Sequence, residues 1–315
     1  MTNRVSGVKY DRPVSFSALA GAREVGRHSH LLRIGSINIL FDPGLHNGAN
    51  GHCANYKGIN KIDYIFLTHA HTDHIGSLCE VMALFPKARV YATAATKHLV
   101  ILALRHRGEE QKLNIAKCAA KITPVSYNQD LELKNRIEAV FIPAGHILGS
   151  ASIIISTPEG KFMITGDYDI TSRGILPPFV PPDIELRALI SEGSFVGMQR
   201  PSPERERNRL IHLVTKEISA ENRVIVAADS LGVFQEYAVY LAFLQTTGNI
   251  PQYRLLFNHW LDDSLDVFKR FSQLLEFDVQ QNQWAGRFEP LGNISQKELV
   301  SDGPYCLFAG PSNLK

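Results

Sequence analysis

The sequence lacks the features that would place the chain in a membrane or direct it out of the cell. No run approaches eighteen consecutive apolar residues, which excludes a transmembrane helix, and residues 1–16 hold no apolar core of a secretory signal. The four cysteines are far apart and form no CxxC pair, so neither a disulfide framework nor a cysteine metal site is expected. These absences predict a cytoplasmic protein without a membrane partner.

Strong net charge and nucleotide-binding motifs are also absent. The formal net charge of +2 argues neither for nor against nucleic acid, because a local basic groove would not appear in the sum. No glycine-rich Walker loop is present, and the glycines between residues 21 and 26 have the wrong spacing for a dinucleotide fingerprint. With 44% hydrophobic residues, the 315-residue chain is long enough for one large domain or two interleaved ones.

What is present is an alternation of short β-type runs and helical spacing. Strands are expected at 15–19, 30–34, 36–41, 64–67, 89–92, 138–142, 152–156 and 162–165, with helices at 77–85 and 97–107. The alternation predicts a layered α/β core. After a breaker cluster at 201–203, a smaller α/β unit is expected, with helices at 204–218, 234–244 and 265–275 and strands at 223–228, 254–257 and 305–309.

A dense group of metal-ligand side chains follows the strand expected at 64–67. His69 and His71 alternate at the strand end and point the same way, and the turn into a helix brings Asp73 and His74 to a neighbouring position. Neutral imidazole and carboxylate are natural ligands of zinc-like ions. Four such residues within six positions after a β run indicate a metal site.

Three further residues follow other expected strands. His146 lies in a glycine-flanked turn after 138–142, and Asp167 directly follows 162–165. Alone, each would be read as a turn residue, but with the first motif they supply a third imidazole and a carboxylate able to bridge two metals. Asp42, at the end of 36–41, is expected to accept hydrogen bonds that orient the ligand loop. A pair of ions roughly 3.5–4 Å apart lowers the pKa of a bridging water to about 7, so the predicted chemistry is hydrolysis by metal-bound hydroxide.

The run HAHTDH with the later His146 and Asp167 resembles the metallo-β-lactamase superfamily. Residues 20–26 (AGAREVG), 144–151 (AGHILGSA) and 191–195 (SEGSF) are similar to motifs of its β-CASP branch, the nucleases related to the cleavage-and-polyadenylation endonuclease subunit and its bacterial and archaeal ribonuclease relatives. The resemblance implies an αββα sandwich over residues 1–198 with an α/β β-CASP-like cap over 199–315.

The resemblance also implies roles for single residues. It assigns a first zinc to His69, His71 and His146, a second to Asp73 and His74, and the bridging position to Asp167, with manganese as the alternative metal. Glu192 and Asp73 are the implied catalytic residues, with Glu192 helping to protonate the leaving group. No residue is implied to contact the substrate.

The C-terminal part departs from the family pattern. No histidine follows His259, so the segment that in the family returns to the core and completes the second metal site is not in this sequence, and that site is expected to be one ligand short. Either the chain is a fragment, or another polypeptide supplies the missing part, or the second metal is weakly bound or absent. The leading hypothesis is a metal-dependent phosphodiesterase that acts on RNA rather than DNA. The alternatives are a DNA nuclease, a small-molecule ester hydrolase of the same fold, and a non-catalytic or partner-dependent subunit of a nucleic-acid-processing complex, with a protein partner or a second copy of the chain as the candidate partners.

Overall fold

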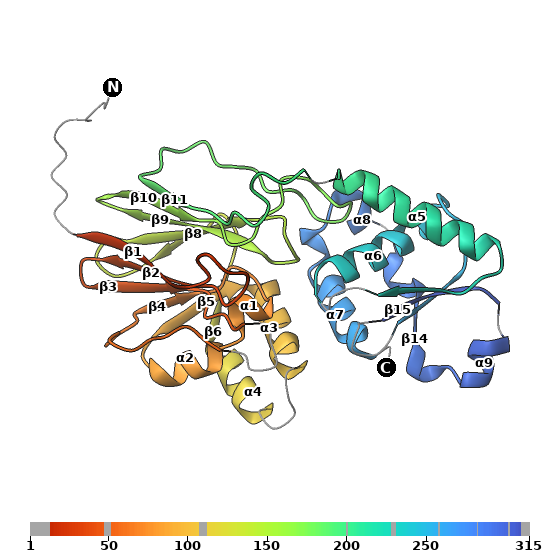
Figure 1. Cartoon of the computed structure of the whole chain (residues 1–315), viewed down its shortest axis with the longest axis horizontal. Helices are drawn as coiled ribbons and strands as arrows, with labels where there is room; N and C mark the ends of the chain where they lie inside the picture. Colours follow the sequence, from red (N-terminus) through yellow and green to blue (C-terminus); the bar gives the residue numbers. More distant parts are fainter. Residues whose placement is uncertain are drawn as a thin grey trace.

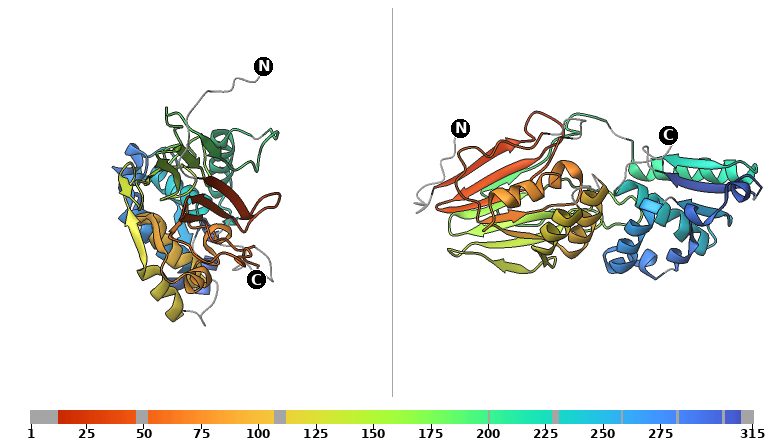
Figure 2. Two further views of the ribbon diagram at one scale, coloured as in Figure 1. Left: turned by 90° about the vertical axis from the view of Figure 1, so that its left-hand side faces the viewer. Right: turned by 90° about the horizontal axis from the view of Figure 1, so that it is seen from below.

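The computed structural model describes residues 13–46, 52–106, 112–199, 201–227, 231–257, 259–281, 283–301 and 303–309. Arg107 and Ala228, the last residues of an expected helix and an expected strand, lie outside them. Two sheets face each other in one half of the molecule, and a third sheet with its own helices forms the other half (Figure 1, Figure 2). No helix in the described part of the chain is long and apolar enough to cross a membrane.

The first sheet has six strands in sequence order. Its first three strands are antiparallel, and the pairings from β3 to β6 are parallel. The strands are β1 (Val14–Ala20), β2 (Ser29–Ile34), β3 (Ile37–Phe41), β4 (Tyr64–Phe66), β5 (Arg89–Thr93) and β6 (Ile122–Val125).

The second sheet has five strands in the order β11-β10-β9-β8-β7, antiparallel except for the pair β10–β11. They are β7 (Asp130–Glu132), β8 (Glu138–Pro143), β9 (Ala151–Thr157), β10 (Gly160–Ile164) and β11 (Ala188–Ile190). The strands β6, β7 and β11 were not predicted from the sequence. Each has only three or four residues and includes exposed positions, so its hydrophobic pattern is weak.

Alternation along the strands divides their side chains between two cores. In β4, Tyr64 and Phe66 face the second sheet, whereas Ile65 faces the helices on the outside. In β9, Ile153 and Ile155 join the core between the sheets. This period of two lets one strand bury both of its faces, which explains the continuous apolar runs in the sequence.

Helices cover the outer face of the six-stranded sheet. They are α1 (Thr72–Ile75), α2 (Leu78–Leu84), α3 (Ala94–His106) and α4 (Lys112–Ala120). On the outer face of the other sheet, Ile154 and Met163 pack against Phe179 and its neighbours in the irregular segment 168–186. The two sheets with these covering layers confirm the expected sandwich.

The second half is built on a parallel sheet in the order β12-β15-β13-β14. Its strands are β12 (Val224–Ala227), β13 (Arg254–Phe257), β14 (Phe288–Pro290) and β15 (Tyr305–Ala309). Its helices are α5 (Pro203–Ser219), α6 (Val233–Thr246), α7 (His259–Arg270), α8 (Phe277–Gln280) and α9 (Gln296–Ser301), with single 3-10 turns at Ser272–Leu274, Trp284–Arg287 and Leu291–Asn293. This half is called the cap below.

The prediction of a helix at 265–275 is wrong at both ends of the helix. Helix α7 begins at His259 and ends at Arg270, after which the chain makes a 3-10 turn. Phe271 and Leu275 are buried in the same core as Leu265 on α7. Their apolar spacing therefore continues the helical pattern past the point where the backbone leaves the helix.

A buried ion pair fastens the cap to the sandwich. Arg173, in the irregular segment, donates from Nε and Nη2 to the Glu236 carboxylate on α6, both at 2.8 Å, and from Nη1 to Asp169 at 2.9 Å. Glu236 is only 2% exposed. Because a buried carboxylate is costly without its partner, this pair holds α6 against the segment that follows Asp167.

The pair predicts a cost for removing only one partner. Arg173→Met leaves Glu236 buried without a counter-ion, and we expect it to lower the free energy of unfolding by about 3–5 kcal/mol. The double variant Arg173→Met/Glu236→Leu removes both charges and is expected to recover most of that loss. Urea denaturation of the two variants measures the difference, and a double variant no more stable than Arg173→Met would contradict the assignment.

Candidate metal centre

The first ligands stand where the buried strand β4 ends. After Phe66 the chain stays extended to His71, which precedes the first turn of α1. The Leu67 N–H still donates to a carbonyl of β5 at 3.0 Å, and the Ala151 N–H on β9 donates to the Thr68 carbonyl at 2.8 Å. These bonds tie the ligand segment to both sheets, so its side chains emerge in a fixed direction.

Turns on the second sheet bring two more ligands to the same place. The His146 turn lies between β8 and β9, where the Ser150 hydroxyl accepts the backbone N–H of His146 at 3.1 Å. Asp167 follows β10 through Gly166, whose φ is +57°. A Cβ on Gly166 would come within 2.6 Å of the Thr68 Cβ, so only glycine lets this turn approach the ligand segment.

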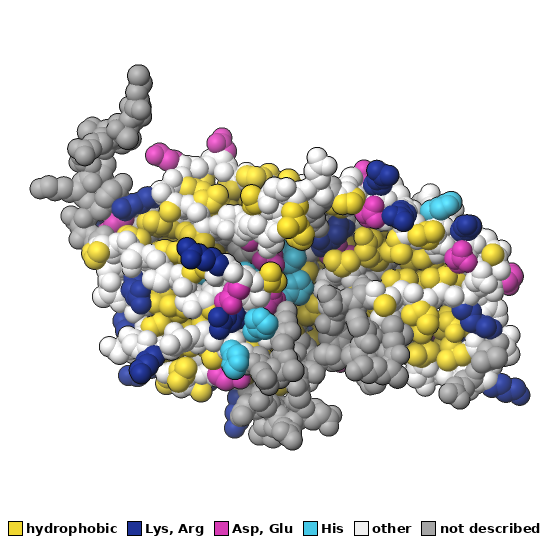
Figure 3. Space-filling model, viewed as in Figure 1, with side chains coloured by type: hydrophobic (Ala, Val, Ile, Leu, Met, Phe, Trp, Pro, Cys, Tyr) yellow, Lys and Arg dark blue, Asp and Glu magenta, His cyan; other side chains and the backbone are white. Residues whose placement is uncertain are grey.

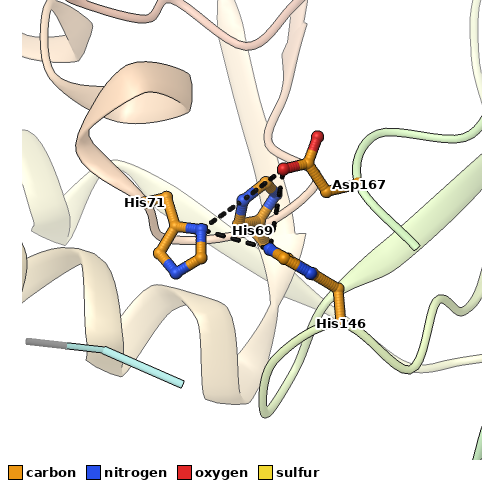
Figure 4. A group of neighbouring side chains, drawn as sticks. All are labelled: His69, His71, His146 and Asp167. Atoms are coloured by element: carbon orange, nitrogen blue, oxygen red, sulfur yellow. Dashed lines mark hydrogen bonds and ion pairs between the residues drawn. The ribbon is translucent and has the colours of Figure 1, made fainter. Parts of the chain in front are cut away.

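Four side chains converge on one point, as Figure 4 shows. His69 Nε2 and His146 Nε2 lie 3.0 and 3.2 Å from His71 Nδ1. The Asp167 Oδ2 atom lies 3.9 Å from His69 Nε2 and 3.6 Å from His146 Nε2. Three imidazole nitrogens and a carboxylate oxygen facing one point form a donor set suited to a divalent metal ion.

A second group shares the same aspartate. Ligand atoms of His28, His74 and Asp167 all lie within 4.8 Å of one another. The distance from His74 Nε2 to Asp167 Oδ1 is 3.4 Å. Asp167 therefore presents Oδ2 to the first group and Oδ1 to the second, which is the arrangement of a carboxylate placed between two ions.

The buried Asp42 carboxylate orients two of the imidazoles. Its Oδ1 accepts the Thr68 N–H at 2.8 Å, and its Oδ2 accepts the Thr68 hydroxyl at 2.7 Å and His74 Nδ1 at 3.0 Å. Because the Thr68 hydroxyl donates to Asp42, its oxygen is left to accept from His69 Nδ1 at 3.1 Å. The network thus places the protons on Nδ1 of His69 and His74 and leaves both Nε2 lone pairs facing the ligand groups.

The cap orients the third imidazole. The Leu231 carbonyl, two residues before α6, accepts from His71 Nε2 at 3.2 Å, so the lone pair of His71 is on Nδ1, which faces the first group. Arg173 in addition donates from Nη2 to the His146 carbonyl. Figure 3 shows histidine and acidic side chains at the surface where the two halves meet. The cap is therefore in direct contact with the candidate centre.

The protonation preferences and an unpaired nitrogen also fit a metal. Burial and the neighbouring imidazoles lower the pKa of His69 well below its usual value and lower the pKa of His146 to about 3. At neutral pH both rings are therefore in the neutral form that binds metals. The Nε2 atom of His74 is buried with no hydrogen-bond partner, which a metal ion would satisfy.

His74 and Asp167 form the strongest charge pair of the centre. Burial alone would lower the pKa of His74, but the carboxylates of Asp167 and Asp42 outweigh it and raise the pKa well above its usual value. Burial would likewise raise the pKa of Asp167, but attraction to His74 and His146 outweighs it and lowers the pKa. The surroundings of His74 thus favour a positive charge beside Asp167, which either a proton on His74 or a bound metal ion would supply.

The structure brings together five of the six residues predicted as metal ligands. His69, His71, His146 and Asp167 form the first group, and His74 shares Asp167 in the second. The remaining one, Asp73, lies in the first turn of α1 and belongs to neither group among the described residues.

Glu192, which was predicted as a catalytic residue and not as a ligand, lies two residues past β11, where its Oε2 accepts the Ser194 N–H at 2.9 Å. His28 is a difference from the sequence analysis, because it belongs to the second group. The sequence analysis missed His28, although two histidines within three residues before and inside a strand (His28 and His30) were a signal in the sequence.

Comparison with known proteins agrees with this geometry. A family model described as the metallo-beta-lactamase superfamily matches residues 22–219. The chain therefore belongs to the metallo-β-lactamase superfamily, and its relatives place it in the β-CASP branch. The resemblance inferred from the HAHTDH motif is confirmed.

Three relatives illustrate the range. The chain is 30% identical to a ribonuclease of Thermus thermophilus over 96% of its own length and 73% of the relative. It is 26% identical to cleavage and polyadenylation specificity factor subunit 3-II of Arabidopsis thaliana, over 94% of this chain and 52% of that protein. It is 24% identical to a transcription termination factor of Methanosarcina mazei, over 96% and 52%. The chain thus spans about half the length of the latter two.

One solved structure supports the fold alone. A protein of unknown function from Enterococcus faecalis V583 matches with a TM-score of 0.61 at 14% identity, over 94% of this chain and 77% of that one. At this identity the likeness concerns the arrangement of the sheets and helices and leaves the chemistry open.

The Asp42 network predicts a specific loss on isosteric substitution. Asp42→Asn keeps the size and tolerates the backbone φ of 54°, but an NH2 donor replaces one of its two acceptor oxygens, so it cannot accept all three hydrogen bonds from Thr68 and His74. We expect metal affinity to fall by about 10–100-fold, measured by competition with a chelator of known affinity.

Asp63→Asn is the matched control for this experiment. Asp63 is also buried and accepts a backbone N–H, from Asn38 at 3.0 Å, but it lies at the opposite end of β4. Its substitution should leave metal affinity unchanged. Equal losses in the two variants would show that Asp42 acts through general stability and not through the ligands.

Proposed function

We propose that this protein is a metal-dependent phosphodiesterase that cleaves RNA. The observation that carries the proposal is Asp167, whose two oxygens face two separate groups of imidazoles. A carboxylate shared in this way is typical of two-metal hydrolase sites. A pair of divalent ions bound here would supply an activated water at neutral pH and stabilise the charge that develops on phosphate oxygens.

Zinc is the proposed metal, with manganese as the alternative. Three imidazoles and a carboxylate suit zinc, and imidazole with carboxylate ligation also accepts manganese. His69, His71, His146 and Asp167 would hold the first ion, and His74 with Asp167 would contribute to the second. The chain's own part in the chemistry is to keep these donors oriented and partly shielded from water.

The relatives support RNA as the substrate class. A ribonuclease of Thermus thermophilus is the relative most fully covered of the three described above, and endoribonucleases of Aspergillus fumigatus and Yarrowia lipolytica are similar at 27% and 26% identity. A site at the junction of the sandwich and the cap also suits a chain-like substrate better than a small ester. We therefore propose RNA over DNA.

Two carboxylates remain candidates for roles beside the ligands. Asp73 is close enough to His71 and His28 for its charge to raise the pKa of both, which partly offsets their burial. Glu192 is held beside the Asp167 turn, since its N–H donates to the Thr165 hydroxyl at 3.3 Å. We propose Asp73 and Glu192 as catalytic residues, within a core of residues 1–198 and a cap that begins at 199.

The proposal predicts metal-dependent cleavage that depends on Asp167. End-labelled single-stranded RNA is incubated with protein loaded with zinc or manganese, and products are resolved on a denaturing gel beside DNA of the same sequence. Asp167→Asn removes an oxygen from one of the two groups. We therefore expect the rate of RNA cleavage to fall by more than about 100-fold, which exceeds the loss typical of substituting a residue that only orients a metal ligand.

The control is Asp183→Asn, an exposed carboxylate on the segment that follows Asp167. It should cleave at the wild-type rate. The proposal fails if wild type loaded with either metal cuts neither RNA nor DNA, or if Asp73→Ala, Asp167→Asn and wild type behave alike. If the protein cuts DNA but not RNA, the proposed substrate class is wrong and DNA takes its place.

A further inference from the structure

His28 is a half-buried histidine at the entrance to β2, next to the second ligand group. Its ring stacks on the ring of His74, with centroids 4.2 Å apart and an interplanar angle of 20°. One of its ring nitrogens lies within 4.8 Å of the ligand atoms of both His74 and Asp167. Two imidazoles, His28 and His74, and the Asp167 carboxylate thus make up the second ligand group.

The backbone of His28 is fixed against the ligand segment. Its N–H donates to the Asp73 carbonyl at 2.8 Å, and its carbonyl accepts the Gly44 N–H at 2.8 Å. A Cβ on Gly44 would come within 1.7 Å of the Asp73 carbonyl oxygen and 2.7 Å of the His28 nitrogen. The loop after Asp42, the first turn of α1 and the entrance to β2 therefore pack backbone to backbone, which fixes the point from which the His28 side chain extends.

The hydrogen bonding around His28 also leaves a ring nitrogen for a ligand site. Among the described residues, no hydrogen bond to either ring nitrogen of His28 is found, in contrast to His69, His71 and His74, which each have one nitrogen engaged by an orienting partner. A lone pair of His28 is thus available at the site.

The second group needs such a donor. His74 and Asp167 supply two ligand atoms there, and the Asp73 carboxylate is not among the converging atoms. We propose that His28 is a ligand of the second metal ion, together with His74 and Asp167. This assignment rests on the proposed two-metal site and names the residue that completes it from the N-terminal part of the chain.

The test counts metal ions and does not depend on activity. Metal-stripped wild type, His28→Gln and His30→Gln are loaded with zinc, separated from free metal by gel filtration, and analysed for zinc per chain; affinities are measured against a chromophoric chelator. His30 is the matched control, because it lies two residues away, is also partly buried, packs on Phe16 and belongs to neither ligand group.

We expect two zinc ions per chain for wild type and His30→Gln. For His28→Gln we expect one ion, or a second ion bound more than about tenfold more weakly while the first keeps its affinity. Two ions of unchanged affinity in His28→Gln would overturn the assignment. So would one ion in wild type, or an equal loss of the second ion in His30→Gln.

A measurement on wild type covers the case in which His28→Gln does not fold. Protein labelled with nitrogen-15 in its histidines is titrated with zinc and followed by long-range proton–nitrogen spectra of the imidazoles. The second equivalent should shift the ring nitrogens of His28 and His74 and leave His30 in place; an unmoved His28 overturns the assignment. If the protein binds two ions, with His28 as a ligand of the second, but cuts no nucleic acid, the proposed nuclease function is wrong and the assignment of His28 is retained.

Discussion

The candidate centre depends on the carboxylate of Asp42. This one buried group accepts three hydrogen bonds, two from Thr68 and one from His74. Through the Thr68 hydroxyl it also determines which nitrogen of His69 carries the proton. An imidazole binds a metal only through an unprotonated nitrogen, so the direction of these bonds decides whether the lone pairs point at the site. The Asp42 network therefore sets the orientation of His69 and His74, one imidazole in each ligand group.

Hydrogen bonds to the cap, direct for His71 and through Arg173 for His146, likewise restrain the other two histidines of the first group. The Leu231 carbonyl accepts from His71, and Arg173 links the His146 carbonyl to Glu236 on α6. A motion that separated the cap from the sandwich would remove the acceptor that orients His71 and the donor that restrains the His146 turn. The position of the cap and the geometry of the centre are therefore coupled through hydrogen bonds.

Much of the sandwich and most of the ligands could be predicted from the sequence because their signals are local. A buried run such as Tyr64–Phe66 identifies a central strand, and a strand end places His69 and His71 on one side. The turns at His146 and Asp167 follow strands with equally clear patterns.

Other features depend on packing between distant segments, which leaves no local pattern. Arg173 pairs with a residue 63 positions away, and the covering layer at 168–186 has no periodicity. The end of α7 was misjudged because Phe271 and Leu275 keep helical spacing while the backbone does not. His28 was not predicted, because the pair His28 and His30 does not by itself show that the loop after Asp42 packs His28 against the first turn of α1.

The two ligand groups therefore differ in how the fold makes them. The first is built from residues at three strand ends, one in the first sheet and two in the second, and it includes Asp167, which the two groups share. The second borrows Asp167, takes His74 from α1, and gains His28 only through the backbone contacts among Asp73, Gly44 and His28. A change at Asp167 must disturb both groups, whereas a change at the entrance to β2 disturbs one. The loop contacts around His28 thus control the second position independently of the first, although the two positions share a carboxylate.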